Sequence, residues 1–178
     1  MSVRHAAALA GSFLLAPTVL SAAALAAPSA AGGIRWTVPA RWTSGAGSAM
    51  RVATYAVPAA NGAEPGECAV FFFGTGQGGG IDDNVARWAK QFEGAPAPKK
   101  TTATVAGMRV TRAEVAGAYL APGGPMMQST GKKAGYRLLG AIVEAPEGNV
   151  FFKLTGPAST IGAAQAEFDA LVASVRKK

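Results

Sequence analysis

The sequence predicts an α+β domain in which a mostly antiparallel sheet of about six or seven strands is covered by two helices, as an α/β/α sandwich. Residues 68–73, 136–145 and 149–155 carry apolar side chains on both faces, which is typical of central strands that are buried on two sides. The predicted strands are joined mainly by hairpin-length links, which favour antiparallel pairing. Two segments with helical periodicity, residues 81–92 and 159–176, can cover the two faces of the sheet.

The first 26 residues have the pattern of a secretory signal peptide. Arg4 and His5 form a short basic region, and an apolar run follows over residues 6–25. Residues 24–26, Ala-Leu-Ala, then supply the small side chains that a signal peptidase requires. We therefore predict that residues 1–26 are removed on export.

An uncleaved membrane anchor is the alternative interpretation of this segment. Alanine is only weakly apolar, and Gly11, Pro17 and Pro28 interrupt the run, which favours cleavage. With cleavage, we expect a periplasmic or secreted protein without a stable membrane span. It would consist of a linker at residues 27–33 and a single domain at residues 34–178.

Two tryptophans stand out at the start of this domain. Ile34, Trp36 and Val38 alternate with polar residues, which predicts a short strand that ends at Pro39. Trp36 and Trp42 have two interpretations. They form a platform for stacking sugars, or they close the edge of the core, and we favour the core.

Two more strands are predicted before the first helix. Residues 50–57 form one of them, and Pro58 ends it. Residues 68–73 are apolar at every position, so we expect this strand to be central. It begins with Cys68, the only cysteine, which excludes an intramolecular disulfide. We predict that Cys68 is a small buried hydrophobic residue rather than a nucleophile.

The glycine-rich stretch at residues 74–79 satisfies the pattern G-x-G-x-x-G between a strand and a helix. Two features argue against a dinucleotide site. Asp82 and Asp83 would repel a pyrophosphate, and hairpins follow where a parallel βαβ unit is needed. We therefore predict no cofactor, and interpret the stretch as a strand-to-helix turn in which Asp82 or Asp83 caps the helix.

The same turn is the first candidate for a ligand site. Its backbone amides and polar side chains can hydrogen-bond a small ligand. The candidate residues are Gly76, Gln77, Gly78, Asp82, Asp83 and Asn84. Their spacing matches no calcium-binding loop, so we predict no metal site.

The first helix has one apolar stripe. Ile81, Val85, Trp88 and Phe92 fall at helical spacing, and Gly94 is expected to end the helix. This stripe is the face that we expect to pack on the sheet.

A hairpin and a long loop follow. Residues 101–105 and 108–119 predict two strands around a turn at residues 106–107. Residues 121–135 lack periodicity, and irregular loops of this length are usually functional or disordered. We predict a flexible loop that binds a partner, with the candidate contacts Met126, Met127, Lys132 and Lys133.

The last three elements are a hairpin and a helix. Residues 136–145 and 149–155 are predicted to pair around a turn at residues 146–148. The helix at residues 159–176 closes the chain. Residues 176–178, Arg-Lys-Lys, are expected at the negative end of its dipole.

Two short motifs accompany this order of three strands, a helix, four strands and a final helix. Pro39 and Trp42 follow the first strand as P-x-x-W, and residues 171–175 of the last helix read Leu-Val-Ala-Ser-Val. On these features the chain resembles the PsbP-like superfamily over nearly all of residues 34–178. The resemblance implies the α/β/α sandwich and a binding or assembly-assisting role without a shared catalytic site. With the predicted signal peptide, the chain would be an exported member of bacterial type.

Histidine chemistry is excluded by the composition. The only histidine, His5, lies in the predicted signal peptide, so histidine-based triads and histidine-ligated zinc sites are excluded. We predict no catalytic residue and a protein that is not an enzyme. The alternative is a small hydrolase that acts on envelope glycans or esters through carboxylates, with Glu114 or Glu144 involved.

The formal net charge is +7, and +6 without residues 1–26. Such a charge favours contact with anionic surfaces, but the basic clusters lack interleaved aromatic residues, so we expect no nucleic acid as a partner. Our first hypothesis is an exported domain of the cell envelope that binds an envelope protein or a small ligand. A further alternative is electrostatic docking on an anionic envelope polymer or lipid.

Overall fold

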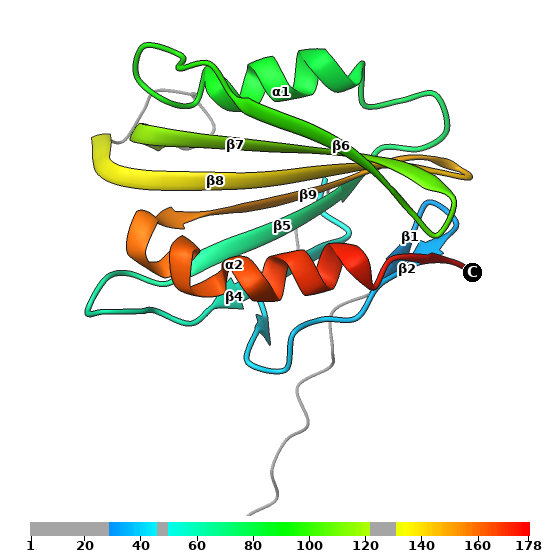
Figure 1. Cartoon of the computed structure of the whole chain (residues 1–178), viewed down its shortest axis with the longest axis horizontal. Coiled ribbons are helices and arrows are strands. Elements are labelled where there is room, and N and C mark those ends of the chain that lie inside the picture. The colour runs from blue at the N-terminus through cyan, green and yellow to red at the C-terminus, as the bar shows by residue number, and fades with distance from the viewer. Residues whose placement is uncertain (1–28, 46–49, 122–130) are drawn as a thin grey trace, which may run out of the picture.

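The computed structural model describes residues 29–45, 50–121 and 131–178. A seven-stranded antiparallel sheet lies between two helices, α1 (Ile81–Ala89) and α2 (Ala158–Ala173), which confirms the predicted α+β sandwich (Figure 1). The sheet has the order β3-β4-β5-β9-β8-β7-β6. Its strands are β3 (Thr43–Ser44), β4 (Ala53–Val57), β5 (Gly66–Phe72), β6 (Lys99–Val105), β7 (Met108–Ala121), β8 (Gly131–Ala145) and β9 (Gly148–Pro157).

A second, three-stranded sheet joins the two ends of the domain. It consists of β1 (Ala30–Ala31), β2 (Ile34–Arg35) and β10 (Arg176–Lys177), with β2 in the middle. The strand predicted at the start of the domain is therefore only two residues long. Arg176 and Lys177 pair with β2, and the last helix ends at Ala173, so the prediction that this helix continues to residue 176 is wrong.

The two faces of the large sheet carry separate apolar clusters. On the α2 side, side chains from β4, β5, β8 and β9, among them Tyr55, Phe152 and Leu154, pack against Ile161 and Phe168 of that helix. On the α1 side, the cluster is smaller and contains Val85, Trp88, Phe92, Leu138, Ile142 and Phe151. The predicted central strands β5, β9 and β8 lie between the two clusters, which explains why they are apolar on both faces.

The two helices contact different sets of strands. Helix α2 has sixteen residues and contacts β8 and β9, whereas α1 has nine and contacts mainly β7 and β8. The part of the α1 face that β5 and β4 form therefore has less helix packed on it. The α1 side of the sheet is therefore the side on which polar groups of the central strands are less covered.

The tryptophans at the start of the domain belong to the core, as predicted. The Trp36 indole nitrogen donates to the Tyr55 hydroxyl at 3.0 Å, and that of Trp42 donates to Glu167 at 3.0 Å. Both indoles are buried. Buried rings offer no platform on which a sugar can stack.

The start of α1 differs from the prediction. Gly80 is the N-cap residue, and no side chain caps this end. Asp82 and Asp83 are the second and third residues of the helix, inside its first turn, so neither is the N-cap residue, although their charge is favourable near the positive end of the helix. The buried Asn84 holds the turn instead, because its side-chain amide donates to the carbonyl oxygens of Gly78 at 2.7 Å and Gly80 at 2.8 Å.

The predicted irregular loop at residues 121–135 is shorter in the structure. Strand β7 continues to Ala121 and β8 begins at Gly131, so both strands extend into the predicted loop. Lys132 and Lys133 pair in register with Leu120 and Tyr119. These polar residues form a strand because β7 supplies hydrogen-bond partners for their backbone, and not because they follow an apolar pattern.

Candidate functional site

A groove lies between α1 and the strands β5 and β9, next to the glycine-rich turn. Its volume is about 150 Å³. The groove is lined by Phe71, Phe73, Asn84, Arg87, Trp88, Gln91, Phe151 and Lys153. It exists because α1 packs mainly on β7 and β8, which leaves the neighbouring strip of sheet partly open.

Aromatic rings form one wall of the groove. The rings of Phe71 and Phe73 are stacked with centroids 6.0 Å apart, and Phe73 meets Phe151 edge-on at 5.8 Å. Phe73 is 38% exposed, and in the described ranges Met50 is the only other large hydrophobic side chain that is exposed. The groove thus presents ring surface to whatever occupies it.

The glycine-rich turn shapes the end of the groove. Gly78 has a φ of +90°, and a Cβ atom on it would come within 2.9 Å of Phe73 and 3.0 Å of Phe151. Only glycine lets the turn lie against these rings. The hydroxyl of Thr75 donates to the Glu147 carbonyl at 2.8 Å, which ties the turn to the hairpin of β8 and β9.

Lys153 reaches the groove from β9, where burial, aided by the nearby charge of Arg51, lowers its pKa to about 8. Its ammonium group donates to the side-chain oxygen of Gln91 at 2.5 Å and lies 5.8 Å from the centre of the Tyr119 ring. Within the described residues, it has no carboxylate partner within 4.0 Å. A half-buried amine is therefore held beside aromatic rings with no carboxylate in direct contact among the described residues, and the more distant charge of Glu67 only partly offsets the lowering of its pKa.

Arg87 is the second cation of the groove. One of its guanidinium nitrogens donates to the side-chain oxygen of Asn84 at 3.1 Å. None of the eight lining residues is acidic. The groove consequently combines four aromatic rings with two basic groups.

Two buried hydroxyl groups lie on the same face of the sheet. Thr155 is two residues beyond Lys153 on β9, and Thr54 pairs with Ala69, whose other neighbour across the sheet is Lys153. The Oγ1 atoms of Thr54 and Thr155 are buried and have no hydrogen-bond partner in the structure as described. Such orphaned groups are uncommon in folded proteins, and they mark this strip of sheet as suited to a polar ligand atom or an ordered water.

The residues predicted for the glycine-rich turn are only partly brought together. Asn84 lines the groove and Gly78 packs against its rings, whereas Gly76 and Gln77 are exposed. Asp82 is turned away, since its carboxylate binds Lys100 of β6 at 2.7 Å.

Lys153 and the aromatic wall were missed by the sequence analysis. The signal that points to them is a lysine within the otherwise apolar residues 150–154, together with the run Phe71–Phe72–Phe73. Burial of a charge in a central strand costs free energy unless the charge is paired, so a lysine at such a position indicates a candidate functional residue.

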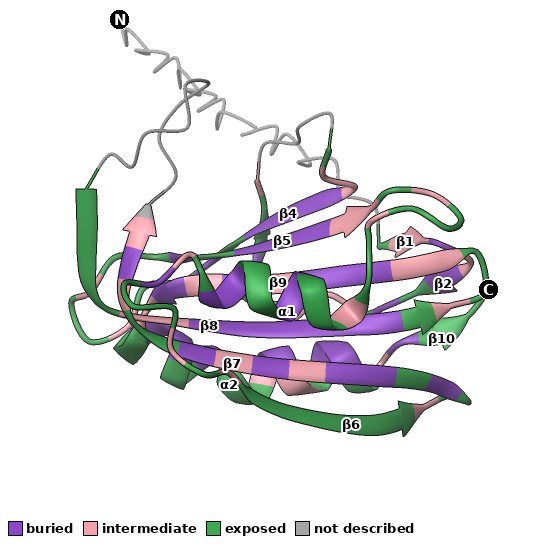
Figure 2. Ribbon diagram, turned by 90° about the horizontal axis from the view of Figure 1, so that it is seen from above, coloured by how far each residue is buried: buried purple, intermediate pink, exposed green. Residues whose placement is uncertain are grey.

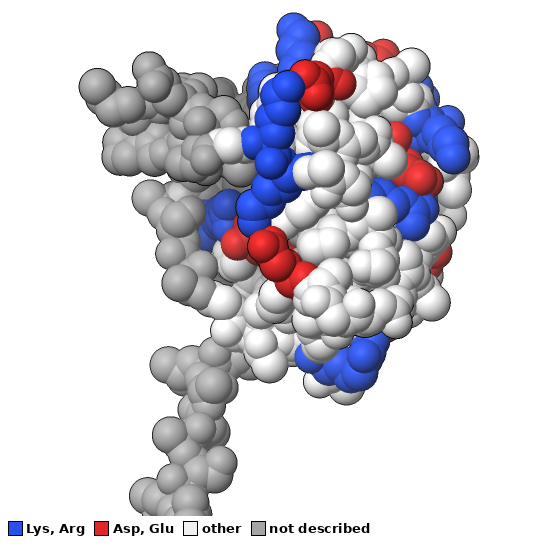
Figure 3. Space-filling model, turned by 90° about the vertical axis from the view of Figure 1, so that its left-hand side faces the viewer, with Lys and Arg blue, Asp and Glu red and all other residues white. Residues whose placement is uncertain are grey.

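The candidate contacts of the predicted partner loop are separated from the groove lining. Lys132 forms an ion pair with Glu93, and Lys133 binds Glu64 at 2.7 Å. At this end of the molecule, basic and acidic side chains lie next to one another (Figure 3). Met126 and Met127 lie outside the described residues.

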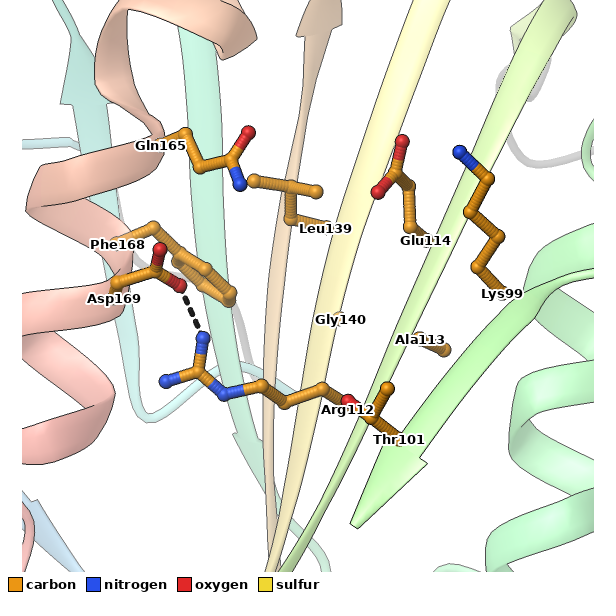
Figure 4. A pocket seen from close by; sticks show the side chains of 10 residues that line it. All are labelled: Lys99, Thr101, Arg112, Ala113, Glu114, Leu139, Gly140, Gln165, Phe168 and Asp169. Carbon is orange, nitrogen blue, oxygen red and sulfur yellow. Dashed lines mark hydrogen bonds and ion pairs between the residues drawn. The ribbon is translucent and has the colours of Figure 1, made fainter. Parts of the chain in front are cut away.

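A second hollow, of about 300 Å³, lies on the other face of the sheet between α2 and the strands β6 to β8 (Figure 4). Arg112 and Asp169 form an ion pair across it. Arg137 donates to Glu114 at 3.0 Å and to Gln165 at 2.9 Å, and its hydrogen bond lowers the pKa of the Glu114 carboxyl. This hollow is lined by both apolar and charged side chains, and its opposite charges are largely paired.

The two carboxylates considered for hydrolysis do not share a cleft. Glu114 lines the hollow beside α2, whereas Glu144 lines a hollow beside Ile81 and Asp82 of α1, on the opposite face. Glu144 lies 3.5 Å from Arg109. A general acid needs a raised pKa, and the pKa of Glu114 moves in the other direction.

Cys68 is fully buried within β5, and burial raises the pKa of its thiol well above the usual range. This agrees with a packing role. Among the described residues, no group of three or more acidic, cysteine or histidine side chains is placed to hold a metal ion. No helix among them is long and apolar enough to cross a membrane.

No protein-family model matches the chain, and no curated protein matches it. Solved structures of similar fold include a protein of unknown function from Pseudomonas aeruginosa, with a TM-score of 0.45 and 15% identity over 68% of this chain and 78% of that one. Cyanobacterial PsbP from Synechocystis aligns with a TM-score of 0.48 and 11% identity over 83% of this chain and 88% of that one. The likeness to cyanobacterial PsbP agrees with the fold-level resemblance that the sequence indicated, and it concerns the fold alone.

Proposed function

We propose that this protein is an exported, non-enzymatic domain of the cell envelope that binds a small organic anion in the groove between α1, β5 and β9. The ligand has a compact aromatic or apolar body and one acidic group. The observation that carries this proposal is the lining of the groove, where four aromatic rings accompany Arg87 and Lys153 and no acid is present.

The two parts of the ligand follow from the two parts of the lining. The rings of Phe71, Phe73 and Phe151 favour a flat apolar body, because apolar area removed from water stabilises the complex by roughly 25 cal/mol per Å². The half-buried ammonium of Lys153 favours an anion, since its hydrogen-bond partner among the described residues is the neutral Gln91 and a carboxylate would add a charge-assisted hydrogen bond. A volume of about 150 Å³ limits the ligand to a single ring with a short acidic side group.

Export is supported by the sequence. Residues 1–26 contain the basic, apolar and small-residue parts of a signal peptide in the required order. A binding domain outside the cytoplasm would meet its ligand in the envelope or in the medium.

A titration with phenylacetate tests the proposal, using a chain that begins at residue 27. Trp88 lines the groove, so its fluorescence reports occupancy, and phenethylamine serves as the probe of similar shape and opposite charge. We expect saturable binding of phenylacetate and at least about tenfold weaker binding of phenethylamine. Equal binding of both probes, or of neither, would overturn the proposal.

Variants localise the site. Lys153→Met and Phe73→Ala should each weaken phenylacetate binding by about tenfold, because one removes the cation and the other the exposed ring. Lys132→Met is the matched control, since Lys132 lies on β8 and forms an ion pair with Glu93 away from the groove lining. Binding that falls equally in all three variants would indicate attraction by overall charge, as expected for docking on an anionic polymer.

A further inference from the structure

Strand β6 (Lys99–Val105) forms an open edge of the large sheet. It is the last strand in the sheet order, and residues 99–104 are all exposed. In Figure 2 this strand runs along the margin of the molecule with its whole length visible. An edge of this length is a template on which another strand can pair.

The turn that follows β6 determines which backbone groups face outward. Ala106 and Gly107 form a two-residue connection to β7, with φ angles of +48° and +74°, as in a type I′ turn. Val105 and Met108, which flank this turn, are then a hydrogen-bonded pair, and the pairs alternate from there along the hairpin.

The alternation leaves three residues with outward-facing backbone groups. Residues 99, 101, 103 and 105 bond to β7, so Lys100, Thr102 and Thr104 direct one N–H and one C=O each away from the sheet. Within the described part of the chain, no backbone partner is recorded for these groups. They match the spacing that an added strand requires.

Hollows flank this edge on both faces of the sheet. On the α2 side, Lys99 and Thr101 border the hollow of about 300 Å³ shown in Figure 4. On the α1 side, Lys100 and Thr102 border another of about 310 Å³. Since successive side chains of a strand point to opposite faces, an added strand would direct its side chains alternately towards the two hollows.

Charge distinguishes the two faces. On the α1 side, Lys100 pairs with Asp82 and Arg109 with Glu144, so the charges there balance. On the α2 side, three cations (Lys99, Arg112 and Arg137) face two acids (Glu114 and Asp169). Lys99 is the cation without an ion pair within 4.0 Å among the described residues of that hollow.

We propose that the outer edge of β6 binds an extended, acidic segment of a partner protein by strand addition, with an acidic side chain of that segment facing Lys99. The backbone of Lys100, Thr102 and Thr104 would pair with the segment. Lysines on an edge discourage a second copy of the same strand, whereas they attract an acidic one. The edge is separate from the aromatic groove, so neither proposal depends on the other.

The probe for the test is a fluorescein-labelled peptide of about seven residues, the length of β6, in which glutamate alternates with threonine. Fluorescence anisotropy measures its binding to the chain from residue 27 onward. We expect saturable binding that weakens at least about tenfold in Lys99→Glu. A peptide of the same sequence with N-methyl groups on alternate residues should also bind at least about tenfold more weakly, because it cannot donate to the edge.

A pair of variants at one position separates backbone pairing from side-chain contact. Thr102→Pro removes an outward-facing N–H, which an edge strand tolerates, and should weaken binding at least about tenfold. Thr102→Ala keeps that N–H and should bind within about twofold of the wild type.

Three results would overturn the proposal. The first is no saturable binding, and the second is equal binding of the methylated and unmethylated peptides. The third is a dimer of the chain alone, seen by sedimentation, that Lys99→Glu leaves intact and that excludes the peptide, because the edge would then pair with a second copy. The peptide comparison uses the unmodified protein, so it decides the question even if Thr102→Pro fails to fold.

Discussion

The ring of Trp88 lies so close to Gly140 that a Cβ atom at position 140 would come within 2.1 Å of ring atom Cζ3. This contact seats α1 on β8, and Trp88 also lines the groove. The position of the helix, and with it the width of the groove, therefore depends on the absence of a side chain at Gly140.

Gly140→Ala should consequently destabilise the protein. We expect a loss of about 2–3 kcal/mol in the free energy of unfolding, because the methyl group would displace Trp88 from a packed site. Urea denaturation measures the change. Gly162→Ala is the control, since nothing lies within 4 Å of a Cβ atom there and alanine is the better helix residue by about 0.5–1 kcal/mol. Equal effects at the two positions would contradict the tight contact.

Replacement of Lys153 by methionine should raise stability at neutral pH. The pKa of Lys153 is lowered to about 8 in the folded protein, below its ordinary value of 10.5, so the folded state disfavours the charged amine. We expect Lys153→Met to be more stable than the wild type by about 1–2 kcal/mol at pH 7. A stabilising substitution that abolishes binding would show that the lysine is kept for function.

The lowered pKa of Lys153 also determines whether the free energy of unfolding rises or falls with pH. Between about pH 8 and 10.5 the unfolded chain binds a proton at Lys153 that the folded protein does not, so stability rises with pH in this window. The advantage of Lys153→Met should therefore shrink as the pH is raised from 8 to 10. An advantage that is constant over this range, measured by urea denaturation, would contradict the lowered pKa.

The ionised form of Glu114, unlike the charged form of Lys153, should stabilise the folded protein. The hydrogen bond from Arg137 lowers the pKa of Glu114, so its stabilising contribution is present above the ordinary pKa and is lost as the pH falls through the lowered value. Glu114→Gln should cost about 1 kcal/mol at pH 7 and much less at strongly acidic pH. Thermal unfolding over pH 2–7 measures the difference, and a cost that persists unchanged in acid would argue against the ion pair.

Cys68 should be unreactive in the native protein. It is fully buried in β5 and its thiol pKa is raised by that burial. We expect Ellman's reagent to label it only after addition of denaturant, with one thiol per chain as the sequence requires. Rapid labelling under native conditions would show that β5 opens readily or lies at an edge.

The strands and helices could be predicted where pattern and burial agree. Residues 68–73 read as a central strand, and β5 does lie within the sheet, because a strand covered on both faces selects apolar residues at every position. The stripe from Ile81 to Phe92 likewise predicted which face of α1 packs on the sheet. For these elements, the pattern of apolar residues in the segment itself indicates which faces are buried.

The extensions of β7 and β8 could not be predicted in this way. Gly131 to Gly135 look like a loop because they are exposed and polar, and their strand conformation comes from pairing with β7. The prediction that Asp82 or Asp83 caps α1 was wrong for a related reason. Asn84 acts backwards on the turn through its side chain, and which of three adjacent polar residues does so depends on where the helix begins.

The groove depends on where α1 lies on the sheet, which no single segment of the sequence reveals. Lys153 is charged in a central strand, and the sequence shows this much. That it remains half-buried beside Phe71, Phe73 and Phe151 follows from the placement of α1, which contacts β7 and β8 more than the strip of sheet that carries Lys153. The site can be predicted only when the position of α1 relative to β5 and β9 is known, and these elements are distant in the sequence.

The most direct test of the anion-binding groove is the pKa of Lys153 itself, measured by NMR titration of its side-chain signals with and without saturating phenylacetate. The unliganded protein should give a pKa near 8, and a bound carboxylate should raise it by about one unit or more, because the anion supplies the missing partner. A Lys153 pKa that stays the same while phenylacetate is bound would contradict the proposed site.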